Sequence, residues 1–150
     1  GVATPTFPVA FSAYLTTTSQ TVTNATFTKV TINTEEFDTN NNYDPTTNYR
    51  FTPTVPGYYQ FSWSAQGTAT GAVQATIASL YKNGSRFKDG SVVAITGSAS
   101  YAISTGSSLV YMNGTTDYVE LYGYVSGSGT MSIGFGSYVT YLSGFLAVAA

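Results

Sequence analysis

Residues 49–65 read YRFTPTVPGYYQFSWSA, and the alternation in their second half decides the fold. Pro56-Gly57 predicts a turn between a short strand and a longer one, because both residues favour turns. Along the longer strand, successive side chains point to opposite sides. One side carries Tyr59, Phe61, Trp63 and Ala65, and the other carries Tyr58, Gln60, Ser62 and Ser64. This pattern predicts a strand whose aromatic side packs on a core.

The rest of the chain carries the same β signals. Thr, Tyr, Val, Phe and Ser dominate, whereas the helix formers Leu, Glu, Lys and Gln are sparse. Asn83-Gly84 separates two strand-like runs and predicts a tight hairpin. Nine or ten strands with regular turn signals predict an all-β sandwich or barrel, and 150 residues suffice for one such domain.

The N-terminal segment differs from the remainder. Residues 1–9 hold two prolines and no alternation, which predicts an extended arm or a stalk junction. Residues 10–150 then form a single domain. The sequence starts with Gly instead of Met, so we expect a piece of a longer protein.

The composition argues against several functions. Cys and His are absent, which excludes disulfides, thiol catalysis and a His-based triad. The five cations are scattered along the sequence, so nucleic acid is not an expected partner. No apolar run reaches the ~18 residues of a membrane helix, so we expect no membrane insertion.

The seven carboxylates offer little chemistry. The only dense group is Glu35, Glu36 and Asp38, which fits a solvated strand end entering a loop. A weak calcium site is the alternative, because loop carboxylates are what calcium prefers. No pair suggests the facing acids of a glycosidase. We therefore expect no enzymatic activity and no cofactor, with calcium as the one open possibility.

The closing segment, residues 137–149, is apolar on both faces. Val139, Tyr141, Phe145 and Ala147 would fill the core, and Leu142, Leu146 and Val148 would face the other way. A strand that is apolar on both faces is covered on both faces. The cover is either a loop of the same chain or another subunit. We predict a subunit interface at Tyr58, Gln60, Ser62, Leu142, Leu146 and Val148.

The spacing of aromatic and glycine residues resembles the C1q domain of the C1q/TNF superfamily. Asp38 is followed by Tyr43, Phe51 and the run from Gly57 through Tyr59 and Phe61 to Trp63. Further similar segments are AFSA at 10–13, LYKNG at 80–84, GSSLVYMNGTTDYVELYGY at 106–124 and SGFLA at 143–147. Ile32 replaces the family's first Phe, seven residues separate Tyr43 from Phe51, and Trp63 replaces a Phe or Tyr. These departures suggest a distant, bacterial or phage member.

The resemblance implies a ten-stranded jelly-roll sandwich that assembles as a homotrimer on a collagen-like or fibrous stalk. The residues that match its core signature are Phe51, Gly57, Tyr59, Phe61, Trp63, Gly144 and Phe145. The implied function is a trimeric head that caps the stalk and presents loops to a receptor. We expect it to lie outside the cell, on a cell or virion surface.

A carbohydrate-binding module is the alternative function, because such modules are also β-sandwiches with exposed aromatic residues. Its candidate ligand surface is Tyr118, Tyr122 and Tyr124, which share one side of a strand. The two functions differ in whether these tyrosines are exposed to solvent or buried between subunits.

Overall fold

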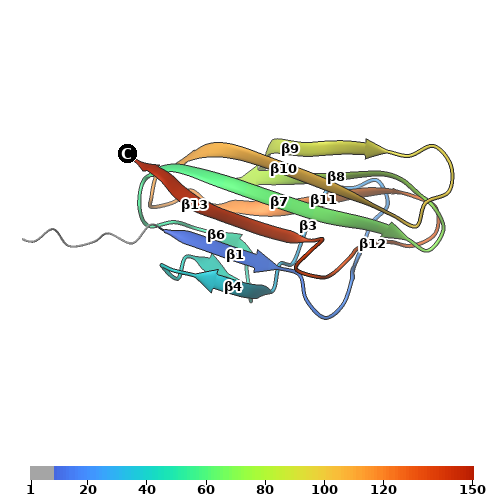
Figure 1. Ribbon diagram of the computed structural model, residues 1–150, viewed down its shortest axis with the longest axis horizontal. Helices are drawn as coiled ribbons and strands as arrows, with labels where there is room; N and C mark the ends of the chain where they lie inside the picture. Colours follow the sequence, from blue (N-terminus) through green and yellow to red (C-terminus); the bar gives the residue numbers. More distant parts are fainter. Residues whose placement is uncertain (1–8) are drawn as a thin grey trace, which may run out of the picture.

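The computed structural model describes residues 9–150, which form two antiparallel β-sheets packed face to face (Figure 1). Within these residues the chain forms thirteen strands and no helix, as the composition predicts. Several strands are only two or three residues long, so the sandwich has more segments than the ten strands expected. The expected arm at residues 1–9 lies outside the described residues except for Val9, which is buried in the core.

The larger sheet has seven strands in the order β2-β12-β7-β13-β1-β4, and β10 also pairs with β7. Its strands are β1 (Ala10–Tyr14), β2 (Gln20–Val22), β4 (Thr34–Asp38), β7 (Gly57–Ala69), β10 (Tyr101–Met112), β12 (Met131–Ile133) and β13 (Tyr141–Ala149). The smaller sheet has the order β5-β6-β11-β8-β9, with β3 also paired to β11. Its strands are β3 (Thr28–Lys29), β5 (Tyr43–Asp44), β6 (Arg50–Phe51), β8 (Val73–Lys82), β9 (Ser85–Ala94) and β11 (Val119–Gly127).

The aromatic side of β7 lies in the core between the two sheets. Tyr59, Phe61 and Trp63 are almost completely buried, and so is Phe51 on β6 of the opposite sheet. The Phe51 ring stacks on Phe11 at a centroid distance of 4.1 Å and meets Phe61 edge to face at 6.0 Å. These ring contacts join the two sheets at the centre of the sandwich.

The predicted hairpin joins β8 and β9. Asn83 and Gly84 have φ angles of 53° and 79°, and Lys82 pairs with Ser85 across the turn. Positive φ at both central residues is the geometry that matches the right-handed twist of the flanking strands. The Asn-Gly pair therefore sets the register at the start of the edge strand β9.

The structure corrects the predicted faces of β13. Leu142 is fully buried, whereas Phe145 is 49% exposed, so Phe145 is not a core residue and Leu142 is not an interface residue. The reason is the register: Gly144 pairs with Phe11 and Phe61, two core residues, which places Leu142 and Leu146 on the inner side. Tyr141 and Ala147, also predicted for the core, are half-buried and exposed.

A bulge near the end of β13 changes its alternation. The pairing with β7 shifts between Leu146 and Val148, so Leu146 pairs with Tyr59 and Val148 pairs with Tyr58. The extra residue returns Val148 to the outer side, where it is exposed. Gly144 faces the core, and a larger residue does not fit at this position, since its Cβ would lie 2.5 Å from the Phe61 ring.

Removal of two buried hydroxyl groups, one at a time, should have opposite effects on stability. Thr76 is fully buried, and its Oγ1 has no hydrogen-bond partner. Thr76→Val should therefore raise the free energy of unfolding by about 1–2 kcal/mol, because it removes an unpaired buried polar group at nearly constant shape. Urea denaturation monitored by circular dichroism measures the change.

The matched control for Thr76 is Ser104, whose buried hydroxyl is fully used. Its Oγ accepts a hydrogen bond from the Ala78 N–H at 2.8 Å and donates one to the Ser91 carbonyl. Ser104→Ala should lower the free energy of unfolding by about 1–3 kcal/mol. Equal effects of the two substitutions would contradict the assignment of Thr76 as unpaired.

Candidate functional site

The outer face of the larger sheet carries an unusual number of exposed apolar side chains. We call this surface the apolar face; its large members are Phe37, Tyr58, Leu109, Tyr111, Phe145 and Val148. Each is about half exposed. They lie on β4, β7, β10 and β13, which are neighbours in the sheet or are joined through β1. Contiguous apolar surface of this kind marks an interaction site in a soluble protein.

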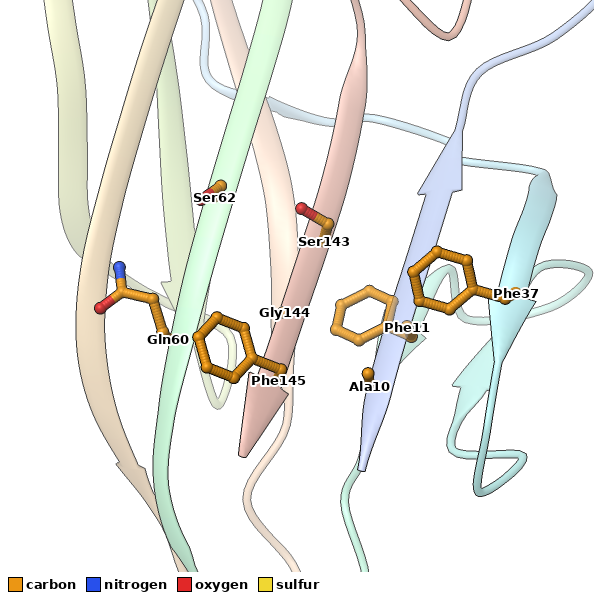
Figure 2. Close-up of a pocket in the computed structure, with 8 residues that line it drawn as sticks. All are labelled: Ala10, Phe11, Phe37, Gln60, Ser62, Ser143, Gly144 and Phe145. Atoms are coloured by element: carbon orange, nitrogen blue, oxygen red, sulfur yellow. The ribbon is translucent and has the colours of Figure 1, made fainter. Parts of the chain in front are cut away.

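A shallow hollow of about 200 Å³ lies in the apolar face. Its lining residues are Ala10, Phe11, Phe37, Gln60, Ser62, Ser143, Gly144 and Phe145. Figure 2 shows them on four adjacent strands, with Phe37 and Phe145 separated by β1. Ser12, Ser143 and Ser62 pair across β1, β13 and β7, and these small side chains leave the space that the two rings border.

The structure brings together part of the predicted interface. Tyr58, Gln60, Ser62 and Val148 lie on the apolar face, whereas Leu142 and Leu146 belong to the core side. The sequence prediction missed Phe37, Leu109 and Tyr111. Residues 109–112 are apolar at every position, so alternation alone does not distinguish the outward Leu109 and Tyr111 from the buried Val110 and Met112.

A second exposed surface lies where β9 and β10 form one edge of the sandwich. Phe87 on β9 is 44% exposed, and Lys88 beside it is exposed as well. The Lys88 Nζ lies 5.6 Å from the centroid of the Phe87 ring. We call Phe87 and Lys88 the edge pair. The edge thus presents an aromatic ring and a positive charge next to the apolar face.

The predicted ligand tyrosines lie on the outer face of the smaller sheet and are half-buried. The Tyr122 ring stacks on Tyr81, with centroids 3.6 Å apart and planes 4° apart. Tyr124 contacts Phe27 at 5.1 Å, and the Arg50 guanidinium lies 4.2 Å from the centroid of the Tyr118 ring. Burial raises the pKa of the Tyr122 hydroxyl. Each of these rings therefore already packs against a neighbour in the same chain.

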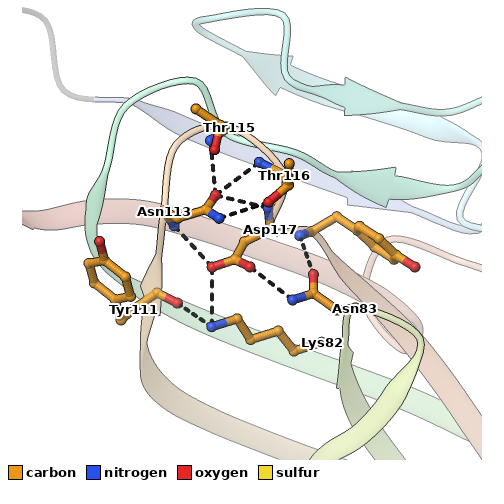
Figure 3. A network of polar contacts seen from close by, with 8 residues as sticks. Lys82, Asn83, Tyr111, Asn113, Thr115, Thr116 and Asp117 are labelled. Atoms are coloured by element: carbon orange, nitrogen blue, oxygen red, sulfur yellow. Dashed lines mark hydrogen bonds and ion pairs between the residues drawn. The ribbon is translucent and has the colours of Figure 1, made fainter.

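A polar network joins the β8–β9 turn to the connection between β10 and β11 (Figure 3). The Asp117 carboxylate accepts hydrogen bonds from the Asn83 side chain at 2.8 Å and the Asn113 N–H at 3.0 Å, and it lies 3.3 Å from the Lys82 Nζ. The Asn113 Oδ1 accepts three successive backbone N–H groups, from Thr115 to Asp117. The polar groups of the network bond to one another within the chain, so the network stabilises this end of the sandwich.

Two aspartates have a lowered pKa in the folded chain, so we expect the protein to lose stability in acid. Burial raises the pKa of the Asp117 carboxyl, but the hydrogen bonds from Asn83 and Asn113 and the Lys82 charge outweigh it, so the pKa is lowered. The N–H groups of Thr46, Thr47 and Asn48 also lower the pKa of Asp44. In the unfolded chain both groups take up protons near pH ~3.9, before the folded chain does. Their stabilisation is therefore present above that pH and is lost as the pH falls below it.

Thermal unfolding between pH 7 and pH 2.5 tests this expectation. The Asp117→Asn variant should lose about 1 kcal/mol at pH 7, because the paired charge is gone. Its unfolding temperature should then fall less steeply in acid than that of the native chain. Parallel curves for the two proteins would contradict the role of Asp117.

The structure does not bring the acidic cluster together as a metal site. Asp38 accepts a hydrogen bond from the Tyr43 N–H at 2.7 Å, while Glu36 accepts one from the Ser12 hydroxyl at 3.4 Å. Burial and the Asp38 charge raise the pKa of Glu35. Across residues 9–150, no three His, Cys, Asp or Glu side chains converge as metal ligands would. The same part of the chain has no helix that is long and apolar enough to cross a membrane.

Comparisons with known proteins agree on one fold. The model of the family described as "C1q domain" matches residues 10–147. The globular domain of zebrafish complement 1qA superposes with a TM-score of 0.65 at 19% identity, covering 95% of this chain and 99% of that one. Eiger TNF from S. frugiperda gives a TM-score of 0.70 at 7% identity, with 96% of each chain covered. Murine APRIL gives 0.64 at 8% identity, covering 93% of this chain and 99% of that one. A search of curated proteins found no significant match.

Proposed function

Because the chain belongs to the C1q domain family, we propose that it is a trimeric, non-enzymatic head domain that caps a fibrous or collagen-like stalk. In this proposal its loops bind a receptor or another ligand outside the cell, on a cell or virion surface. C1q and TNF-like domains are typically trimeric, bind receptors or ligands, and are generally not enzymes. The absence of His and Cys from the whole sequence is consistent with that class.

The apolar face is the observation that carries the proposal. It exposes large side chains on adjacent strands, and an uncovered surface of this kind is costly in water. The low charge of the chain, with a formal net charge of −2, gives little repulsion between copies. A ring of copies joins two different surfaces of each chain, and the apolar face and the edge pair supply two such surfaces.

The positions of the start of β1 and of the C-terminus fit a head on a stalk. Figure 1 shows the start of β1 and the C-terminus at the same end of the sandwich. The loops at 70–72, 95–100 and 128–130 lie at the opposite end. A stalk entering before β1 would leave these loops at the free tip. They contain Ser, Thr, Gly and Ala almost exclusively, so the tip is polar but uncharged.

The outer face of the smaller sheet remains exposed when the apolar face is covered. We keep Tyr118, Tyr122 and Tyr124 as the proposed ligand surface, since each is half-exposed there. If a glycan stacks on these rings, Tyr124→Ala should reduce binding on a glycan array. The same substitution should leave the number of chains per particle unchanged, because Tyr124 lies away from the apolar face.

Native mass spectrometry of the unmodified chain at micromolar concentration tests the assembly. The proposal predicts particles of three chains. Particles of one chain only would overturn the trimeric head, whatever ligand the tyrosines bind.

A further inference from the structure

Charge is unevenly distributed over the two sheets. All five cations of the chain lie on the smaller sheet or its strand ends: Lys29, Arg50, Lys82, Arg86 and Lys88. Three of them pair within the chain, in the ion pairs Lys29–Glu120, Lys82–Asp117 and Arg86–Asp89. Arg50 lies over the Tyr118 ring. Among residues 9–150, no carboxylate lies within ion-pair distance of Lys88.

Glu36 is the matching negative charge on the larger sheet. It lies on β4, and the register between β4 and β1 shifts beside it, because Ser12 pairs with Phe37 and Ala13 pairs with Glu35. The bulge turns Glu36 to the outer side, where its carboxylate accepts the hydrogen bond from Ser12. No cation in the described part of the chain pairs with it. Glu36 therefore lies beside Phe37, one of the residues that line the hollow.

Glu36 and Lys88 lie at opposite edges of one sandwich. β4 ends the larger sheet on one side, and β10 lies at its other side next to β7. β9 packs closely beside β10. The short distance is seen at Gly90, where an added Cβ would lie only 2.5 Å from the Thr105 carbonyl oxygen. A single chain cannot bring the two charges together.

The two charges nevertheless lie at the same level along the strands. One cross-strand row of the larger sheet runs through Phe37, Ser12, Ser143, Ser62 and Ser107. β9 and β10 are consecutive strands that run in opposite directions, and Gly90 lies beside Thr105. Because the strands run in opposite directions, Lys88, two residues before Gly90, lies level with Ser107, two residues after Thr105. A rotation about an axis parallel to the strands keeps this level, so it can bring Lys88 of one copy to Glu36 of the next.

We propose that Lys88 of one copy forms an ion pair with Glu36 of the next copy, and that Phe87 of the first copy covers the hollow between Phe37 and Phe145. The inference rests on the proposed trimer and names the contact that closes it. Each copy supplies the edge pair to one neighbour and the hollow to the other, which is a head-to-tail contact that closes into a ring. The ion pair selects the register, since a like charge at either position would repel.

A charge exchange tests the pair by the concentration at which the trimer dissociates in sedimentation. Lys88→Glu and Glu36→Lys should each raise this concentration at least about tenfold, because each change acts at all three contacts of the ring. The double variant Lys88→Glu/Glu36→Lys should return to within about threefold of the native chain. A matched control is Glu35→Lys, which makes the same charge change one residue away and should have less than a threefold effect.

Salt distinguishes an ion pair from a change in packing. Added salt should weaken the native trimer and strengthen the two single variants, because screening reduces attraction in the first and repulsion in the others. Failure of the double variant to recover, or an effect of Glu35→Lys as large as that of Glu36→Lys, would overturn the pairing while leaving the trimer intact. A native chain that is monomeric would instead overturn the proposed function and the pairing with it.

Crosslinking gives a readout independent of stability. The chain has no Cys, so Lys88→Cys and Glu36→Cys introduce the only thiols. With a short bismaleimide, the double Cys variant should give covalent trimers on a denaturing gel. Each single variant has one thiol per chain and can give dimers at most. Only monomers and dimers from a trimeric double variant would overturn the proposed contact.

Discussion

Phe145→Glu is expected to convert the trimer into monomers at micromolar concentration. Phe145 is 49% exposed in a single chain and lies between Ala10 and Gln60 in the centre of the apolar face. A carboxylate at this position would have to be buried between subunits without a partner. Central aromatic residues of interfaces contribute about 2–4 kcal/mol each, and an unpaired buried charge adds to that loss. Light scattering should therefore report one chain per particle.

The control for Phe145 is an exposed apolar residue of the other sheet. Val92 is 64% exposed and lies on β9, the strand of the edge pair. It pairs with Ile77, whereas Lys88 pairs with the buried Leu80, so the side chains of Val92 and Lys88 leave β9 on opposite sides. Val92→Glu should leave the particle mass unchanged. Circular dichroism should show that both variants fold, because both side chains are already exposed in the single chain. Retention of the trimer by Phe145→Glu would show that the apolar face is not the interface.

Trp63→Ala is expected to lower the free energy of unfolding by about 3–5 kcal/mol. Trp63 lies near the middle of β7, is 1% exposed, and is the only Trp of the chain. Its indole N–H donates a hydrogen bond of 3.0 Å to the Ala78 carbonyl on the other sheet. Removal of the ring leaves a cavity and an unpaired carbonyl between the sheets. Such a loss is a large part of the ~5–15 kcal/mol that holds a typical domain folded.

Urea denaturation monitored by circular dichroism measures this loss, since the variant has no Trp fluorescence. The proteins should be compared at one concentration, because assembly adds to apparent stability. Trp63→Phe is the matched control: it keeps much of the ring and should cost clearly less than Trp63→Ala. A loss below about 1 kcal/mol for Trp63→Ala would contradict its position as the centre of the core.

The core of the fold could be predicted from residues 49–65. Strict alternation in β7 separates Tyr59, Phe61 and Trp63 from the small and polar residues on the other side, so the buried side is unambiguous. The Asn83-Gly84 hairpin was equally clear, because few residue pairs adopt two positive φ angles. Both signals are local, and neither depends on which strand lies beside which.

The candidate site could be predicted only in part. β13 is apolar on both sides, so its alternation shows that both faces are covered but not which residues face the core. The pairing of Gly144 with Phe11 and Phe61 decides that question, and the bulge before Val148 reverses it again. Phe37 was missed because the acidic residues beside it in Thr34–Asp38 indicate a solvated strand end. These residues become a surface only when β4, β1, β13 and β7 lie side by side.

Sedimentation equilibrium of the native chain tests the central claim most directly. One chain has a mass of 15.8 kDa, so a trimer built on the apolar face should fit a single species of about 47 kDa, three times 15.8 kDa. The fitted mass should stay constant across micromolar concentrations. A mass of 15.8 kDa over the same range would contradict the account, because the apolar face would then be exposed to water in the working protein.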